Sequence, residues 1–264
     1  MSKQQSPVWW RSPDKSVMLL HGDVKVILPR LQERSIDIVW TDPPYFLSND
    51  GSTCQNGQRV SVNKGKWDRA KGDAAGNFEF TRWWLERCRS LLRPNGSLWA
   101  SGTSHVIYSV GFAMQQLGYK LINEVIWEKP NPPPNLACRC LTHSHETLIW
   151  AARSKYDCSH YFDYSAMKAE NDDKQMKDVW RMTAPGKDEK KHGKHPTQKP
   201  EALVDRCLAA SCPPGGTVLD PFNGSGTTGV VAVRRGLKYI GIELDEQHLV
   251  TTKARILDVR PDWA

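Results

Sequence analysis

The chain has 264 residues, of which 39% are hydrophobic and 25% are charged. This composition is ordinary for a folded protein and excludes disordered, collagen-like and fibrous classes. Lys and Arg outnumber Asp and Glu by 36 to 29, and the resulting net charge of +7 permits nucleic acid or acidic substrates as partners. No apolar stretch approaches the roughly 18 residues of a membrane span, and the first residues lack a signal-peptide core, so we expect a cytoplasmic protein without a membrane partner.

The cysteines favour reduced thiols over a disulfide framework. There are seven of them, an odd number, in a chain too long to be a disulfide-stabilised mini-domain. Cys138 and Cys140 precede His143 and His145, but this spacing is not one of the usual zinc-binding pairings with a long intervening loop. We therefore expect no metal site.

Short apolar runs alternate with helix-like segments along the chain, which predicts an α/β fold around a mostly parallel sheet. The expected strands cover residues 16–20, 36–40, 97–101, 125–128, 147–151, 217–220 and 238–243. The expected helices cover residues 24–32, 78–92, 105–117, 201–211 and 227–235, the second of them capped by Asn77. No helical pattern separates the strands at 125 and 147, so we expect one of them to run antiparallel. A single domain over residues 1–264 accommodates this alternation.

Two long polar stretches interrupt the pattern. Residues 46–76 are rich in Gly, Ser and Asn, and residues 153–194 end in a basic run. Residues 46–76 also contain several Lys and Arg residues. Taken alone, the basic residues of either stretch are consistent with a solvated loop. Loops of this length inside a compact domain are usually functional or disordered, and both interrupt the same sheet. We therefore expect them to flank one cleft.

The strongest local motif is the glycine-rich segment after the strand at 217–220. The sequence Asp220-Pro221-Phe222-Asn223-Gly224-Ser225-Gly226-Thr227-Thr228-Gly229 predicts a tight turn that opens a helix and lets a ligand approach the backbone. One strand later, Glu243 is placed to accept hydrogen bonds from the hydroxyls of a ribose. Together they outline a nucleoside pocket. Because the glycines also fit G-x-G-x-x-G, a dinucleotide-dependent oxidoreductase remains open at this point.

A second motif, Asp42-Pro43-Pro44-Tyr45, follows the apolar strand at 36–40. Neither proline nitrogen can donate, so the Asp42 carboxylate and the carbonyls of Asp42 and Pro43 form an acceptor-rich corner beside an aromatic ring. Two such acceptors can hold the hydrogens of a heterocyclic amino group and favour the electron-rich geometry needed for attack on a methyl group. An isolated tetrapeptide of this kind is equally consistent with an Asp that caps a turn.

The two motifs in this order resemble the amino-methylating DNA methyltransferases of the β arrangement, in which the catalytic half precedes the S-adenosylmethionine half. The resemblance covers about residues 16–256 and extends to segments 21–23, 131–135, 145–150 and 195–200. Segments 45–49, 66–68 and 174–180 make the chain most similar to adenine-N6 enzymes that modify GATC or GANTC sites. The resemblance implies a Rossmann-like methyltransferase fold with this permuted motif order.

The resemblance also implies roles for individual residues. Those of the catalytic corner, with Tyr45 stacking on a flipped base, are Asp42, Pro43, Pro44 and Tyr45. Those expected at the cofactor are Asp23, Asp42, His195, Pro196, Thr197, Lys199, Asp220, Phe222, Gly224, Ser225, Gly226, Thr227 and Glu243. Lys199 is either a contact to the cofactor carboxylate or a surface residue before a helix that begins at Pro200.

DNA is the implied partner, as duplex or single strand. A mobile loop over residues 46–76 and a recognition segment over 153–194 are expected to contact it. Residues proposed to bind it are Lys64, Lys66, Arg69, Asn135, Arg139, Lys187, Lys190 and Lys191. The implied reaction is direct methyl transfer to adenine N6, with an N4-cytosine enzyme as the alternative because it uses the same corner. A homodimer and a cognate restriction endonuclease are compatible with the resemblance.

Overall fold

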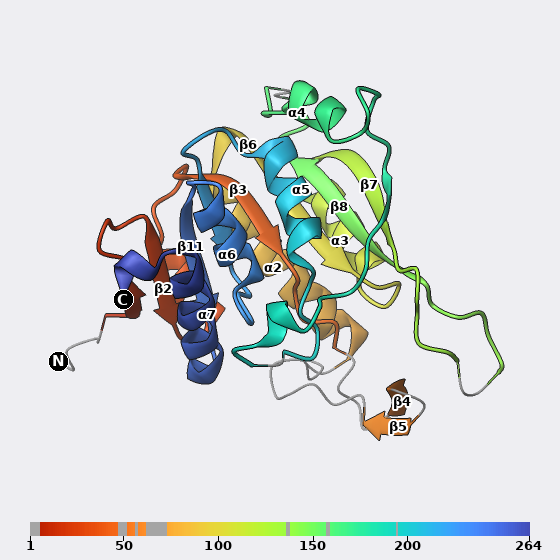
Figure 1. Ribbon diagram of the computed structural model, residues 1–264. Coiled ribbons are helices and arrows are strands. Elements are labelled where there is room, and N and C mark those ends of the chain that lie inside the picture. The colour runs from red at the N-terminus through yellow and green to blue at the C-terminus, as the bar shows by residue number, and fades with distance from the viewer. Residues whose placement is uncertain are drawn as a thin grey trace.

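The computed structural model describes residues 6–46, 73–135, 138–156, 159–193 and 195–264, and the backbone of 52–55 and 58–61. A nine-stranded sheet forms the centre of the molecule, in the order β1-β2-β11-β10-β3-β6-β8-β7-β9 (Figure 1). Its strands are β1 (Val8–Arg11), β2 (Val17–His21), β3 (Ile36–Thr41), β6 (Leu92–Gly102), β7 (Lys120–Glu128), β8 (His145–Ala152), β9 (Val179–Arg181), β10 (Thr217–Asp220) and β11 (Lys238–Glu243). The predicted α/β fold is confirmed.

Five adjacent strands, from β2 to β6, run parallel. β8 lies antiparallel between β6 and β7, so the predicted antiparallel strand is confirmed. This reversal brings the start of β8, with Glu146 as its second residue, to the edge where the parallel strands end. At the opposite border of the sheet, β1 pairs antiparallel with β2, and the sequence patterns did not predict it.

Helices cover both faces of the sheet (Figure 1). One face carries α5 (Glu201–Ser211), α6 (Thr227–Arg234) and α7 (Glu246–Val259), and the other carries α1 (Val24–Ile27), α2 (Ala74–Leu91) and α3 (Ile107–Gln116). Side chains of β3 alternate between them, with Trp40 packed in the α5 and α6 cluster and Val39 in the α2 cluster. Because both faces are covered, the central strands are apolar throughout rather than alternately polar.

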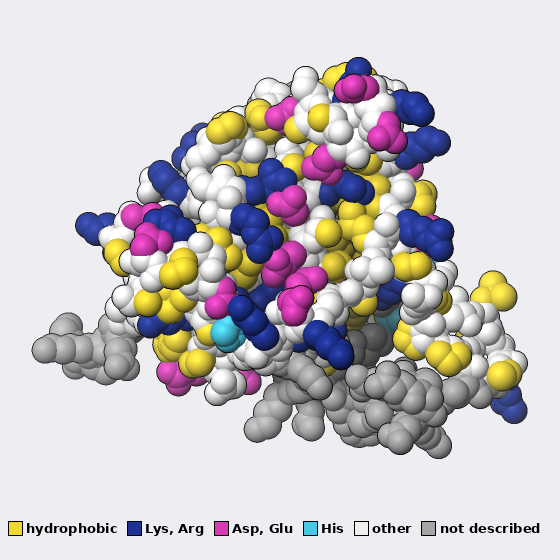
Figure 2. Space-filling view, viewed as in Figure 1, with side chains coloured by type: hydrophobic (Ala, Val, Ile, Leu, Met, Phe, Trp, Pro, Cys, Tyr) yellow, Lys and Arg dark blue, Asp and Glu magenta, His cyan; other side chains and the backbone are white. Residues whose placement is uncertain are grey.

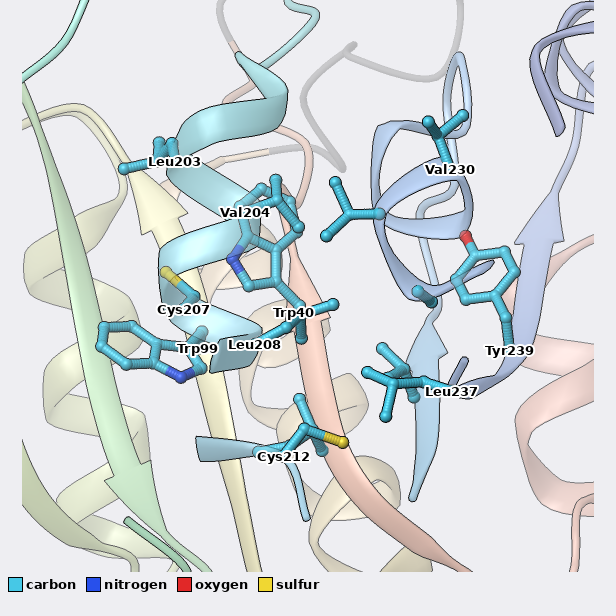
Figure 3. Packing of buried hydrophobic residues seen from close by; sticks show 14 of the residues in the cluster. Trp40, Trp99, Leu203, Val204, Cys207, Leu208, Cys212, Val230, Leu237 and Tyr239 are labelled. Carbon is cyan, nitrogen blue, oxygen red and sulfur yellow. The ribbon is translucent and has the colours of Figure 1, made fainter. Parts of the chain in front are cut away.

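Tryptophans fill the layer between α5 and the sheet. Trp40 and Trp99 lie against the helix residues Val204, Cys207 and Leu208 (Figure 3). The Trp99 ring stacks on Trp150 of β8 with ring centroids 5.0 Å apart and an interplanar angle of 2°. The indole N–H of Trp99 donates to Ser211 Oγ at 2.8 Å, which satisfies its polar atom inside the core.

Helix boundaries differ most from the sequence expectations in α1 and α2. α2 begins at Ala74, because Asp73 rather than Asn77 caps it by accepting from the Gly76 N–H at 2.9 Å. α1 ends at Ile27 and continues only as a 3₁₀ turn, since Pro29 cannot donate to a helical hydrogen bond. α7 was not predicted at all.

The two polar stretches contain secondary structure. A two-stranded sheet, β4 (Ser52–Gln55) with β5 (Gln58–Ser61), lies within residues 46–76. The candidates Lys64, Lys66 and Arg69 lie outside the described residues. Segment 153–194 contains α4 (Tyr164–Ala169), β9 and a 3₁₀ turn, Asp188–Lys190.

Segment 153–194 reaches both edges of the sheet, and its place beside a cleft shared with segment 46–76 stays a prediction. β8 ends at the amino ends of the parallel strands, and α4 lies at that edge, at the top of Figure 1. β9 pairs with the last three residues of β7, so the chain has returned to the carboxyl ends of the strands by Val179. Among the described residues, no helix is both long and apolar enough to cross a membrane.

Candidate active site

A pocket opens at the carboxyl ends of β2, β11, β10 and β3. Its lining is Gly22, Asp23, Val24, Lys25, Trp40, Asp42, Pro44, Phe80, His195, Thr197, Gln198, Lys199, Asp220, Pro221, Phe222, Asn223, Gly224, Ser225, Thr227, Thr228, Ile242, Glu243, Leu244 and His248. All residues expected at the cofactor are in this lining except Pro196 and Gly226. Both halves of the sequence therefore meet in one cavity, at the usual ligand edge of a parallel sheet.

The glycine-rich turn brings α6 close to its neighbours. Gly226 caps α6 with a φ of 78°, and a Cβ there would lie 2.3 Å from Thr252 Cγ2. A Cβ at Gly229 would lie 2.7 Å from Tyr239 Cε1 of β11. Only glycine permits both approaches, so these two positions fix the helix against the sheet and α7, beside the pocket.

Glu243 is held by backbone donors at the end of β11. The Gly224 N–H donates to Oε2 at 2.7 Å, and the N–H groups of Leu244 and Asp245 donate to Oε1 at 2.9 Å. These bonds fix the carboxylate at the pocket wall, where its further lone pairs suit a pair of hydroxyls. Glu243 therefore lies in the pocket wall, and its contact with a ribose stays a prediction.

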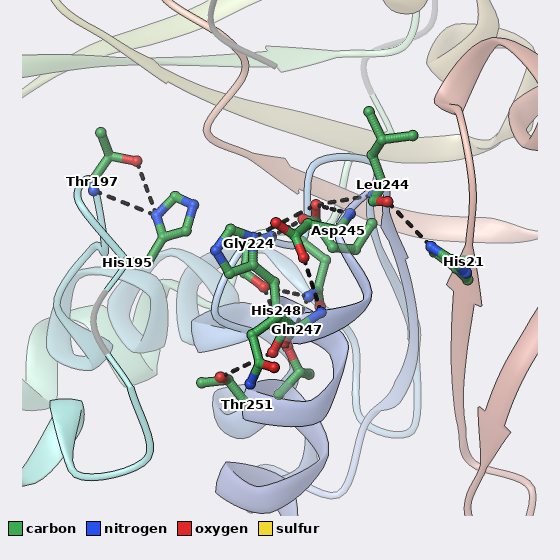
Figure 4. Close-up of polar contacts among 12 residues, drawn as sticks. His21, His195, Thr197, Gly224, Leu244, Asp245, Gln247, His248 and Thr251 are labelled. Carbon is green, nitrogen blue, oxygen red and sulfur yellow. Dashed lines mark hydrogen bonds and ion pairs between the residues drawn. The ribbon is translucent and has the colours of Figure 1, made fainter. Parts of the chain in front are cut away.

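His248 of α7 is a pocket residue that the sequence did not predict. Its Nδ1 lies 3.7 Å from Glu243 Oε1, and this carboxylate raises the pKa of the imidazole. Its ring meets that of His195 edge to face, with centroids 4.7 Å apart (Figure 4). Recognition of α7 as a helix that starts after Asp245 would have been the signal that places His248 here.

Asp220 lies at the start of the glycine-rich turn and is buried. It accepts from Thr228 Oγ1 at 2.7 Å and from the Phe222 N–H at 3.1 Å. Burial raises the pKa of Asp220 to about 7. The two hydrogen bonds that Asp220 accepts hold the turn between β10 and α6.

The catalytic corner predicted at Asp42 is a buried network. Tyr45 Oη donates to Asp42 Oδ1 and Lys199 Nζ donates to Asp42 Oδ2, each at 2.5 Å. Lys199 is only 4% exposed, so its interpretation as a surface residue is wrong. Burial raises the pKa of Asp42, and the Lys199 ammonium opposes this by favouring the carboxylate.

Similarity to known proteins agrees with this geometry. Residues 36–254 match the DNA methylase family of N6 and N4 methyltransferases. The chain belongs to this family. It is 47% identical over 242 residues to the type II methyltransferase M2.LlaDCHI of Lactococcus lactis subsp. cremoris, covering 92% of this chain and 90% of that protein. M2.DpnII of Streptococcus pneumoniae is also 47% identical, over 240 residues, covering 91% and 89%.

Solved structures share the fold of this DNA methylase. The crystal structure of the M1.HpyAVI–SAM complex aligns with a TM-score of 0.68 at 25% identity, covering 91% of this chain and 98% of that one. The cytosine-N4-specific PvuII DNA methyltransferase aligns with a TM-score of 0.73 at 18% identity, covering 98% and 95%. The expected Rossmann-like methyltransferase fold is thus confirmed.

Three of the candidate DNA-binding residues of the methylase have partners of their own. Asn135 donates to the Cys140 carbonyl at 2.9 Å, and Lys190 donates to the Pro185 carbonyl at 2.7 Å. Lys191 pairs with Asp258 at 2.9 Å. Lys and Arg side chains lie among Asp and Glu on the face in Figure 2. DNA contacts at Asn135, Arg139, Lys187, Lys190 and Lys191 therefore stay predictions.

No group of three or more His, Cys, Asp or Glu side chains that could hold a metal ion occurs among the described residues of the methylase. Cys88 and Cys207 are buried in its two core clusters, and burial raises the pKa of both thiols, that of Cys207 to about 12. These two thiols are packing groups.

Proposed function

We propose that this methylase is a site-specific DNA methyltransferase that transfers the methyl group of S-adenosylmethionine to N6 of adenine in a short recognition sequence. One observation carries the proposal: a single pocket extends from the Glu243 carboxylate to Asp42 and Pro44. One bound cofactor could therefore contact the proposed ribose acceptor, Glu243, at one end and reach the proposed amine-binding corner at the other.

The residues present fit S-adenosylmethionine. Glu243 offers fixed acceptors for the ribose hydroxyls, Phe80 and Ile242 offer apolar surface for the adenine, and the glycine turn leaves room beside the backbone. The cofactor supplies an electrophilic methyl group on a sulfonium. Thr197 lies on the lining between His195 and Lys199, toward the Asp42 end of the pocket, where its hydroxyl can meet the polar methionine end.

The corner formed by Asp42, Pro43 and Pro44 activates the target amine for methyl transfer. The Asp42 carboxylate and the Pro43 carbonyl accept hydrogen bonds from the two N–H groups of the target amine. These hydrogen bonds concentrate electron density on the amine nitrogen. Pro44 presents no competing donor. With the cofactor bound, the nitrogen would form its bond to the methyl carbon as the carbon–sulfur bond breaks and the sulfur keeps the electron pair as a neutral thioether. No covalent enzyme intermediate is needed, and Asp42 is placed to take the proton that the amine releases. The target base must leave the duplex to reach this buried corner.

Adenine is favoured over cytosine by the aspartate at position 42 and by the segments 45–49 and 174–180, which resemble those of GATC- and GANTC-modifying enzymes. An N4-cytosine enzyme remains the second candidate, because the fold is shared with the cytosine-N4-specific PvuII enzyme. A dinucleotide-dependent oxidoreductase would leave the Asp42 network without a role. Such a methyltransferase acts on DNA in the cytoplasm, and a homodimer and a cognate restriction endonuclease are compatible with it.

The test is methylation of unmodified DNA, duplex and single-stranded, by the purified protein with S-adenosylmethionine. Nucleoside mass spectrometry identifies the product, and single-molecule sequencing maps the modified sites. We expect N6-methyladenine at one short motif, abolished in Asp42→Ala. N4-methylcytosine would overturn the base assignment, and absence of product from a protein shown to bind the cofactor would overturn the function.

A further inference from the structure

A second buried carboxylate, Glu146, lies beside Asp42. Because β8 runs antiparallel, its second residue arrives at the carboxyl edge of the parallel strands. Glu146 Oε2 lies 3.4 Å from both Lys199 Nζ and Tyr45 Oη. Its Oε1 accepts from Lys129 Nζ at 2.5 Å. The side chain of Glu146 is only 12% exposed, so these contacts are shielded from water.

Lys199 is shared between the two carboxylates. Its ammonium has three N–H bonds, and three acceptors surround it: Asp42 Oδ2 at 2.5 Å, the Thr197 carbonyl at 3.2 Å and Glu146 Oε2 at 3.4 Å. The ammonium also lies over the Tyr45 ring, 5.4 Å from its centroid. In this arrangement Lys199 has no donor left for a cofactor carboxylate, so its partners assign it to the Asp42 corner.

The charges of the network cancel. Asp42 and Glu146 supply two negative charges, and Lys199 and Lys129 supply two positive ones. Although burial opposes ionisation, the two lysines hold the pKa of Glu146 at about 2, so it remains a carboxylate at neutral pH. Removing one member leaves an uncompensated charge in a buried site, which a protein tolerates poorly.

We propose that Glu146 is a positioning residue for methyl transfer, which shares the Lys199 ammonium and orients the Tyr45 hydroxyl so that Asp42 is ionised and still electron-rich when the amino group arrives. Without Glu146, Lys199 would pair with Asp42 alone, and this stronger ion pair would make Asp42 a weaker acceptor for the amine. Without Lys199, two neighbouring buried carboxylates would repel and one would take up a proton. The inference rests on the proposed function, because it assumes an amine at Asp42.

The pH dependence follows from the groups that face one another. Lys199 faces Asp42, Glu146 and Tyr45, and Asp42 additionally interacts with Asp220. Although burial lowers it, the two carboxylates together raise the pKa of Lys199. Glu146 also contributes to the raised pKa of Asp42. Activity needs ionised Asp42 and protonated Lys199. As pH increases, kcat should therefore first rise as Asp42 ionises and then fall as Lys199 loses its proton.

Glu146→Gln keeps the shape of the side chain and removes its charge. Both pKa values should then fall, and both limbs of the kcat profile should move to lower pH. We expect kcat at neutral pH to fall about tenfold, with the KM values for DNA and cofactor nearly unchanged. The matched control is Glu128→Gln, since Glu128 faces His145 across the ladder, is 44% exposed and lies 3.9 Å from exposed Arg181. The control should retain the wild-type profile.

Lys129→Gln provides an independent arm should Glu146→Gln fold poorly. It removes a positive charge from the same network, so both limbs should move to higher pH, opposite to Glu146→Gln. Unshifted limbs in a folded Glu146→Gln or Lys129→Gln protein would overturn the inference, as would a loss seen only in KM. If the wild-type protein methylates no DNA, the proposed function fails instead.

Discussion

Lys199 and Asp42 are 157 residues apart in the chain, yet their side chains form an ion pair of 2.5 Å at the end of β3. Asp42 directly follows β3, and Lys199 comes from the segment that leads into α5. The pair therefore joins the two halves of the methyltransferase sequence at the proposed catalytic corner. Its function is electrostatic, because burial alone would favour a protonated Asp42.

Replacement of Lys199 by Met should strongly reduce turnover while sparing cofactor binding. Loss of the ammonium raises the pKa of Asp42 further. The protonated acid can then no longer accept the hydrogen bond from the amine or take up the proton that the amine releases. We expect kcat to fall by about 10²-fold or more. Single-turnover methylation and calorimetric titration with S-adenosylmethionine measure the two effects separately. The surface variant Lys238→Met is the control. A cofactor affinity lost in parallel with kcat would return Lys199 to the role of a carboxylate contact.

Gly226→Ala should destabilise the protein more than Gly215→Ala. Both glycines have positive φ, 78° and 68°, so alanine is strained at both. At Gly226 the new methyl group would also overlap Thr252, whereas no atom lies within 4 Å of a Cβ at Gly215. We expect about 1 kcal/mol of destabilisation at Gly215 and about 3 kcal/mol at Gly226. Urea unfolding at equilibrium measures both. Equal losses would show that Thr252 moves aside.

The parts of the site that the sequence predicted are those fixed by local chain geometry. The run Asp220–Thr228 and the corner Asp42–Tyr45 each follow a strand whose apolar pattern is plain, and strand ends gather at one edge of a parallel sheet. Glu146, Lys129 and His248 escaped prediction for a non-local reason. They reach the site through the reversed direction of β8 and the packing of α7, which depend on sheet order.

The same reasoning accounts for errors in the polar segments. Segment 153–194 reads as one long loop because α4 and β9 span only 6 and 3 residues, too short for a periodic pattern. Which edge of the sheet each part occupies is set by β9 running parallel to β7. Composition contains no record of that pairing.

His248→Gln should alter the pH dependence of stability. Glu243 raises the pKa of His248 above its usual 6.5, so the imidazolium contributes stability that is fully present below about 6.5 and is lost as pH rises through the raised value. The difference in unfolding free energy between wild type and His248→Gln should therefore shrink from pH 5.5 to 8.5. Urea unfolding across this range measures it, with the exposed His105→Gln as control. A difference independent of pH would mean that His248 stabilises the wall of the pocket by packing alone.

DNA binding should separate the two edges of the sheet. Arg139 lies in the segment between β7 and β8, at the edge where Asp42 lies, whereas Lys168 lies on α4 at the opposite edge. If Arg139 contacts a phosphate, Arg139→Ala should weaken binding to all sequences and reduce the slope of log affinity against log salt by about 1. Lys168→Ala should leave both unchanged, because α4 is remote from the edge that receives the base. Fluorescence anisotropy with labelled DNA at several salt concentrations makes the comparison. A larger loss from Lys168→Ala would place the DNA across the α4 edge and contradict entry of the base at the carboxyl ends of the strands.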